Sequence, residues 1–245
     1  MTRRLAVLLV LLWFAATAIA APRRKGTKAR RGRVTSSIDA TTTPAYRYAG
    51  LSQDACEAEL STRKIDFIRE TARGVLAPVR LLGPLHGVTF RTRLSAEARE
   101  TTPYEIADCR LVLALDDFAE VLEAHGIVEV LHYSMYRPPS ASWPEDRIAT
   151  RHAGALSLDV GKLVHRDGTV LDVERDFHGR IGGVTCGPKA RPRPPTPLAL
   201  ELRAILCETT ARRLFNVVLT PNHNRAHRNH FHIEVTAGVG WFMVD

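Results

Sequence analysis

The chain has 245 residues, of which 45% are hydrophobic and 24% are charged. These fractions are ordinary for a globular protein, and they exclude a wholly disordered chain, a collagen-like repeat and a small disulfide-rich miniprotein. The formal net charge is +8, but residues 1–34 contain nine basic residues and no acidic one. The rest of the chain carries 25 basic and 26 acidic residues. Because a nucleic-acid-binding domain concentrates basic charge on its folded part, we expect no specific nucleic-acid partner.

The first twenty residues have the pattern of an export signal. Arg3 and Arg4 precede an apolar run, and Ala18-Ile19-Ala20 forms a small-residue cleavage site. The apolar run is shorter than the roughly 20 residues that span a bilayer, although an uncleaved anchor is the alternative. We therefore predict a signal peptide over residues 1–20, an exported protein that is periplasmic or secreted, and no transmembrane span after cleavage.

The next segment, residues 21–47, is basic and then rich in Ser and Thr. It has too few large apolar residues to offset the entropy of ordering, so we predict a flexible linker. A compact domain is expected over residues 48–245. Its predicted helices and strands alternate without a regular β-α-β pattern, which favours an α+β fold.

Hydrophobic periodicity predicts the elements of this domain. The expected helices cover residues 54–70, 110–125 and 198–214. The expected strands cover residues 127–136, 155–160, 215–220 and 229–235, and a hairpin over residues 163–173 turns at Asp167-Gly168. Residues 187–197 (GPKARPRPPTP) form a Pro/Arg loop with no regular structure.

Four cysteines follow the signal peptide, and none forms a C-x-x-C pair. A thiolate zinc knuckle or a redox motif is therefore unsupported. An even number of cysteines in an exported chain is compatible with two disulfides. Three connectivities are possible, and we favour Cys56–Cys109 with Cys186–Cys207.

Four of the ten histidines lie within residues 223–232. Side chains alternate between the two faces of a strand, so Phe231, Ile233 and Val235 would enter the core. His230 and His232 would then share the opposite face and could bind one ion. The alternative is a surface strand that carries histidines by chance.

A second segment, RHAGALSLDV at residues 151–160, offers further ligands. His152 lies just before the expected strand, and Asp159 lies on the face opposite to the core. Together with one histidine of the H-x-H pair, they would supply two nitrogens and one oxygen. This set suits zinc and leaves a fourth position for water, as in catalytic sites.

These motifs resemble the bacterial extensin-like C-terminal domain family. The matching pieces, between Cys56 and Val235, are ADCRLVLAL, HYSMYRPP, HAGALSLDV and FNVVLTPNHNRAHRNHFHIEV. The family looks related to the metallopeptidase superfold of lysostaphin, D-alanyl-D-alanine peptidases and the hedgehog domain. The resemblance implies a small antiparallel sheet that carries a zinc site and is flanked by helices.

The resemblance also implies roles for individual residues. His152, Asp159 and His232 would bind Zn²⁺, and His230 would act beside the metal as a base or transition-state stabiliser. Arg137 would contact the substrate, although a solvated loop cation is the alternative.

Two further residues match the family pattern and would support the ligands. His227 belongs to the A-H-x-x-H-F-H pattern, and Glu234 would orient a histidine. An exposed strand carboxylate is the alternative for Glu234. The glycine at Gly154 and the amide at Asn229 depart from the family pattern.

The resemblance and the export signal together suggest a function. We expect a zinc-dependent peptidase or amidase-type hydrolase that cleaves peptide bonds of peptidoglycan or muropeptides, using zinc-bound water and the neighbouring histidine. The alternative is a non-catalytic module on the same fold that binds the cell wall.

Overall fold

The computed structural model describes residues 33–34 and 39–245, which belong to one compact unit. The predicted signal peptide and most of the predicted linker lie outside the described residues. Within them, no helix is both long and apolar enough to cross a membrane.

The folded part begins earlier than residue 48. A 3-10 turn over Ala40–Thr42 leads into helix α1 (Pro44–Ala49), in which Ala45 and Tyr48 are buried. The Tyr48 hydroxyl donates a hydrogen bond to Asp117 at 2.6 Å. Residues 44–47, assigned to the linker from their composition, are therefore helical, because this tyrosine anchors them to the core.

The main sheet contains eight strands of the described chain, in the order β1-β11-β9-β10-β7-β6-β4, with β8 paired to β7. Their bounds are β1 Arg33–Val34, β4 Thr89–Thr92, β6 Ile127–His132, β7 Ser157–His165, β8 Val170–Asp172, β9 Val217–Leu219, β10 Phe231–Glu234 and β11 Phe242–Val244. Two pairs, β4–β6 and β11–β9, are parallel. The sheet is thus larger than predicted and mixed, because short strands with no alternation pattern extend both edges.

A second sheet of the described residues joins β2 (Phe67–Arg69), β3 (Pro78–Leu81) and β5 (Ala107–Asp108). The helix expected over residues 54–70 is wrong in its second half. Helix α2 covers only Gln53–Thr62, and Lys64 takes a left-handed φ of 58° before the chain enters β2. Local composition did not reveal this turn, because lysine rarely adopts such a conformation.

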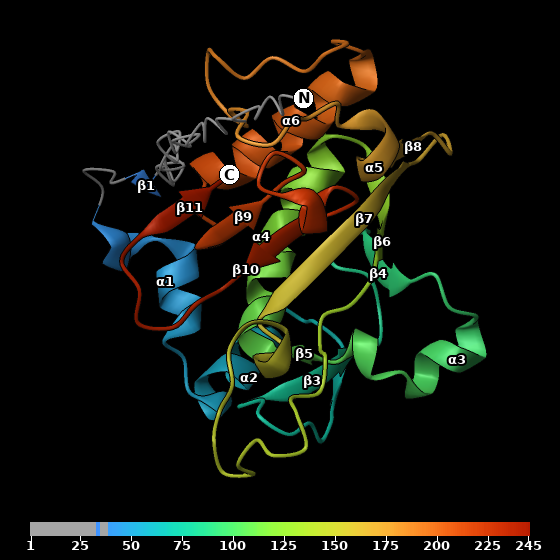
Figure 1. The fold of residues 1–245 in the computed structure, drawn as a ribbon. Coiled ribbons are helices and arrows are strands. Elements are labelled where there is room, and N and C mark those ends of the chain that lie inside the picture. The colour runs from blue at the N-terminus through green and yellow to red at the C-terminus, as the bar shows by residue number, and fades with distance from the viewer. Residues whose placement is uncertain (1–32, 35–38) are drawn as a thin grey trace, which may run out of the picture. The chain divides into compact units, whose positions relative to one another are not determined.

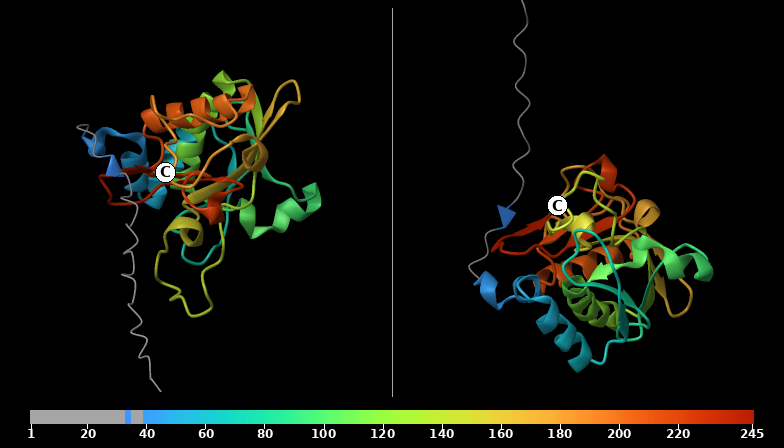
Figure 2. Two further views of the ribbon diagram at one scale, coloured as in Figure 1. Left: turned by 45° about the horizontal axis from the view of Figure 1, so that its top comes forward. Right: turned by 90° about the horizontal axis from the view of Figure 1, so that it is seen from below.

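Helix α4 (Cys109–Ala124) forms the centre of the core. All of its residues from Cys109 to Asp116 are buried. The Asp108 side chain accepts a hydrogen bond from the backbone N–H of Arg110 at the helix start. Helix α6 (Pro197–Ala211) lies next to α4 (Figures 1 and 2). Phe118 of α4 contacts Phe215 edge-on, with ring centroids 5.7 Å apart. Both predicted helices are confirmed within a few residues.

The remaining helical elements are short. They are α3 (Ala96–Thr101), α5 (Val173–Asp176), and 3-10 turns η2 (Pro103–Glu105), η3 (Arg151–Gly154) and η4 (Arg225–His227). The turns η3 and η4 precede the strands that carry the candidate ligands.

The strand predicted over residues 155–160 and the first arm of the hairpin predicted over residues 163–173 form a single strand. One long strand, β7, runs through Gly161 and pairs with β6 and β10 on its two sides (Figure 1). The turn at Asp167-Gly168 and the return strand β8 are confirmed. Pairing with two neighbours keeps β7 continuous between the two predicted elements.

Both favoured disulfides are present. Cys56–Cys109 links α2 to the start of α4, and Cys186–Cys207 ties the loop before α6 to that helix. The other two connectivities are thereby excluded.

Candidate metal centre

The centre is built on one antiparallel strand pair. In the register of β7 and β10, Asp159 is the direct partner of His232. Directly opposed residues present their side chains on the same face of a sheet, with Cβ atoms about 5 Å apart. Phe231, Ile233 and Val235 point into the core as predicted, and all are at least 98% buried. The pairing alone therefore brings a carboxylate and an imidazole together.

His152 reaches them from the turn η3. Its backbone carbonyl accepts a hydrogen bond from Arg137 N at 3.0 Å, and its Nδ1 lies 2.9 Å from the Met135 carbonyl. Gly154 allows this turn to close, because a Cβ there would lie 2.3 Å from the carbonyl oxygen of Ala149. The loop after β6 thus fixes the imidazole from two sides.

Three atoms of these residues form a small triangle. His152 Nε2 lies 3.1 Å from Asp159 Oδ1 and 3.2 Å from His232 Nδ1, and the last two atoms are 2.9 Å apart. All three side chains are buried. Among the described residues they form a group that could hold a metal ion.

The outer hydrogen bonds determine which nitrogens carry protons. A carbonyl only accepts, so His152 Nδ1 donates to Met135 and leaves a lone pair on Nε2. On His232, Nε2 lies 3.2 Å from Glu234 Oε2. Burial alone would raise the pKa of Glu234, but hydrogen bonds from His232 and Thr236 outweigh it and lower the pKa, so the carboxylate accepts. A lone pair therefore remains on His232 Nδ1.

The triangle consequently joins three acceptor atoms, which repel each other unless a cation or a proton lies among them. Burial would raise the pKa of Asp159, but the two imidazoles hold it far below its usual range. For His232, burial opposes the charged form, yet Asp159 and Glu234 raise its pKa. The site is thus a buried anionic position that attracts positive charge.

The donor set fits zinc. Two imidazole nitrogens and one carboxylate oxygen are usual zinc ligands, with bonds of about 2.0–2.1 Å. Ligands of a tetrahedral ion with such bonds are about 3.3 Å apart, close to the edges of this triangle. Three protein ligands are typical of catalytic zinc sites.

His230 and Arg137 are also close to the Asp159 carboxylate. His230 Nε2 is 3.4 Å from Asp159 Oδ1, and Nδ1 is 3.0 Å from the side-chain oxygen of Asn229. Burial lowers the pKa of His230 more than Asp159 raises it. Arg137 donates from Nη2 to Asp159 Oδ2 at 2.7 Å, and its side chain is 53% exposed.

The two supporting residues are placed differently. Glu234 contacts His232 directly and is buried rather than exposed. His227 makes no hydrogen bond to the triangle: its ring lies 5.8 Å from that of His232, and its Nδ1 lies 2.9 Å from Asn224 Oδ1. Burial and the neighbouring histidines lower the pKa of His227 to about 4.

A cavity of about 650 Å³ opens beside the triangle. The candidate ligands, Arg137, His230, His227 and Glu234 all line it. Sequence reasoning missed the rest of its wall. His223, whose Nδ1 lies 2.9 Å from Asp245 Oδ2, had no assigned role, and Trp241 and Met243 lie in a segment without a recognisable motif.

Residues 195–243 match the family model described as "Extensin-like protein C-terminus". This segment is extensin-like. No curated protein and no solved structure shows a significant match to the chain. The extensin-like segment contains α6, β9, β10, His230 and His232, whereas His152 and Asp159 lie outside it. The predicted resemblance is confirmed for this segment.

Proposed function

We propose that the protein is an exported zinc-dependent hydrolase that cleaves peptide bonds of peptidoglycan. The observation that carries the proposal is the triangle of three lone-pair-bearing atoms, 2.9–3.2 Å apart, on the wall of an open cavity. His152, Asp159 and His232 would hold the ion. The same proposal includes three further expectations. They are a relation to the D-alanyl-D-alanine peptidase superfold, export by the N-terminal signal, and a substrate in the cell wall.

When bound, zinc supplies Lewis acidity, which polarises a carbonyl group and activates water near neutral pH. The remaining steps belong to the chain. Asn229 holds the Nδ1 proton of His230, so Nε2 is free to accept a proton beside the triangle. His230 would return that proton to the leaving amine.

Arg137 would bind the substrate. Its guanidinium lies on the cavity wall and uses Nη2 for Asp159, which leaves other N–H groups of the half-exposed side chain for a carbonyl or carboxylate oxygen. The apolar wall, with Leu219, Trp241 and Met243, would exclude water from one side of the substrate.

The test measures metal content and cleavage together. The wild-type protein, stripped with EDTA and equilibrated with zinc, should retain about one zinc per chain by elemental analysis. It should release new amine groups from purified sacculi. His232→Ala should lose both properties, whereas His86→Ala, at a half-exposed histidine outside the cavity, should keep both.

The outcomes separate the alternatives. A wild-type protein that retains no zinc contradicts the proposal. In that case a proton shared among His152, Asp159 and His232 would offset the repulsion between their three acceptor atoms. Stoichiometric zinc and binding to sacculi without new amine groups would instead support the non-catalytic wall-binding module.

A further inference from the structure

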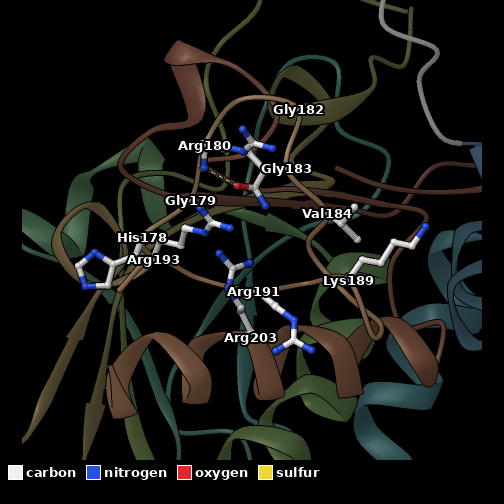
Figure 3. A pocket seen from close by; sticks show the side chains of 11 residues that line it. His178, Gly179, Arg180, Gly182, Gly183, Val184, Lys189, Arg191, Arg193 and Arg203 are labelled. Atoms are coloured by element: carbon white, nitrogen blue, oxygen red, sulfur yellow. Dashed lines mark hydrogen bonds between the residues drawn. The ribbon is translucent and has the colours of Figure 1, made fainter. Parts of the chain in front are cut away.

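A second cavity, of about 390 Å³, lies between the loop of residues 178–193 and helix α6 (Figure 3). It shares no lining residue with the cavity of the metal centre. Its lining contains no carboxylate but five cationic side chains: Arg180, Lys189, Arg191, Arg193 and Arg203. In the described part of the chain, none of the five forms an ion pair. We name it the basic cavity.

Arg203 distinguishes this cavity from an ordinary basic surface. It is only 6% exposed, and its Nη2 donates to the Phe177 carbonyl at 3.2 Å. Its guanidinium also lies 4.0 Å from the centre of the Phe177 ring. The buried nitrogens Nε and Nη1 have no hydrogen-bond partner among the described residues. Unsatisfied buried donors on a charged group are costly, so the fold has placed a guanidinium where an external acceptor would stabilise it.

The arrangement of the side chains indicates where that acceptor would lie. Figure 3 shows Arg203 rising from α6 toward the loop, and the side chain of Arg193 reaching into the same space, whereas Lys189 extends away from it. Burial lowers the pKa of Arg203, which reflects the cost of keeping its charge unpaired. Exposed arginines can be stabilised by water alone, but this one cannot.

The loop over the cavity is held in place. Asn222 is 2% exposed, accepts from Arg180 N at 2.8 Å through its side chain, and accepts from Gly182 N at 2.7 Å through its carbonyl. Gly179 permits this close approach, since a Cβ there would lie 2.5 Å from the Asn222 side-chain oxygen. The Cys186–Cys207 disulfide fastens the same loop to α6. The cavity is therefore largely formed before any ligand arrives.

We propose that the basic cavity binds a phosphoryl group. Its size lies in the range of small-molecule sites, and arginine forks match the oxygens of phosphate. A phosphate monoester carries about two negative charges and three acceptor oxygens, so it can engage Arg203 and the neighbouring arginines together. A carboxylate carries one charge and two oxygens and would leave more of the cationic groups unpaired.

The test is calorimetric titration of the full chain with inorganic phosphate and, separately, with acetate. We expect phosphate to bind at least tenfold more tightly than acetate, with the same affinity in zinc-loaded and EDTA-treated protein. The double variant R180A/R193A removes two exposed guanidinium groups and should weaken phosphate binding at least tenfold. The double variant K64A/R93A removes the same charge from exposed positions outside the cavity and should change binding less than twofold.

Arg203→Met probes the buried group directly and should abolish phosphate binding. Circular dichroism checks that this variant folds. If it does not fold, R180A/R193A tests the proposal instead. Equal phosphate binding by R180A/R193A and K64A/R93A, or acetate binding as tight as phosphate binding, overturns the proposal. Absence of phosphoryl binding with every probe also overturns it.

Two further probes identify the source of the phosphoryl group. Glycerol 1-phosphate represents a soluble phosphomonoester, and vesicles that contain phosphatidic acid represent a lipid headgroup that is also a phosphomonoester. We identify the source as the probe that binds the wild-type protein most tightly and that R180A/R193A no longer binds. The result is independent of zinc retention by His232→Ala, so the two proposals can fail separately.

Discussion

Glu234 Oε2 lies 3.2 Å from His232 Nε2, on the side of the imidazole opposite to Asp159. Thr236 donates a hydrogen bond to the other Glu234 oxygen at 2.7 Å, which fixes the carboxylate. Glu234 thus sets the tautomer of His232 and would make Nδ1 the ligand atom for the proposed metal. The sequence placed both side chains on one face of the strand but left open whether Glu234 was merely exposed.

Glu234→Leu should lower zinc affinity by about 10- to 100-fold, because the variant loses the acceptor that orients His232. Competition with a chromogenic chelator measures the affinity. Glu234→Gln keeps an acceptor oxygen and should lose less than Glu234→Leu. If the two variants lose the same affinity, charge rather than orientation is the property that matters.

Arg137→Ala should lower kcat/KM on muropeptides by about 100-fold, the usual cost of losing one donor to the transition state, while zinc stoichiometry stays at one. The separation is expected because Arg137 contacts Asp159 Oδ2, whereas the Oδ1 atom of the triangle is positioned by the pairing of β7 with β10. Arg151→Ala is the matched control: Arg151 lines the same cavity, is 76% exposed and lies 3.8 Å from Glu234. An equal loss in both variants would indicate a general effect of cavity charge.

His132 should make the protein sensitive to mild acid. It is 1% exposed, and neither ring nitrogen has a hydrogen-bond partner in residues 33–34 and 39–245. Burial lowers its pKa from 6.5 to about 3. Below pH 6.5 the unfolded chain binds a proton that the folded chain excludes, so stability is lost as the pH falls. This residue should lower the free energy of unfolding by about 2 kcal/mol between pH 7 and pH 5, at about 1.4 kcal/mol per pKa unit.

Urea denaturation in EDTA at the two pH values measures this loss, and His132→Leu should remove that part of it. EDTA excludes acid release of a metal as the cause. A pH dependence that is unchanged in His132→Leu would contradict the assignment, whereas His227, whose pKa is also lowered, contributes equally in both proteins.

The two disulfides should contribute unequally. Loop-closure entropy predicts a loss of about 4 kcal/mol for C56A/C109A, which opens a separation of 53 residues, and about 3 kcal/mol for C186A/C207A, with a separation of 21. Urea denaturation of each double variant checks the order. C186A/C207A should also weaken phosphate binding, because it frees the loop over the basic cavity, and C56A/C109A should not.

Periodicity predicted α4, α6 and β10 well, because the spacing of their apolar residues can be read from the local sequence. It failed at residues 63–70, where the turn at Lys64 depends on tertiary contacts rather than on a turn residue. The short strands of the second sheet carry too few residues for any period to show.

The candidate ligands were predictable because strand alternation and the H-x-H spacing are local features. The pair of His223 with Asp245 joins separate segments without a motif, so no local pattern could reveal it. The basic cavity could not be predicted from the net charge. Residues 35–245 are nearly neutral as a whole, although five cationic side chains line one cavity.

The register that opposes His232 to Asp159 has a consequence for how the protein matures. A slip of one residue would turn every side chain of β10 to the other face. High-affinity capture of the proposed metal would therefore require this pairing, which spans 73 residues of chain. An ion that binds only the completed pair stabilises the native state by mass action. Zinc uptake during refolding should therefore report the closure of β7 on β10, a long-range event, and not the formation of α4.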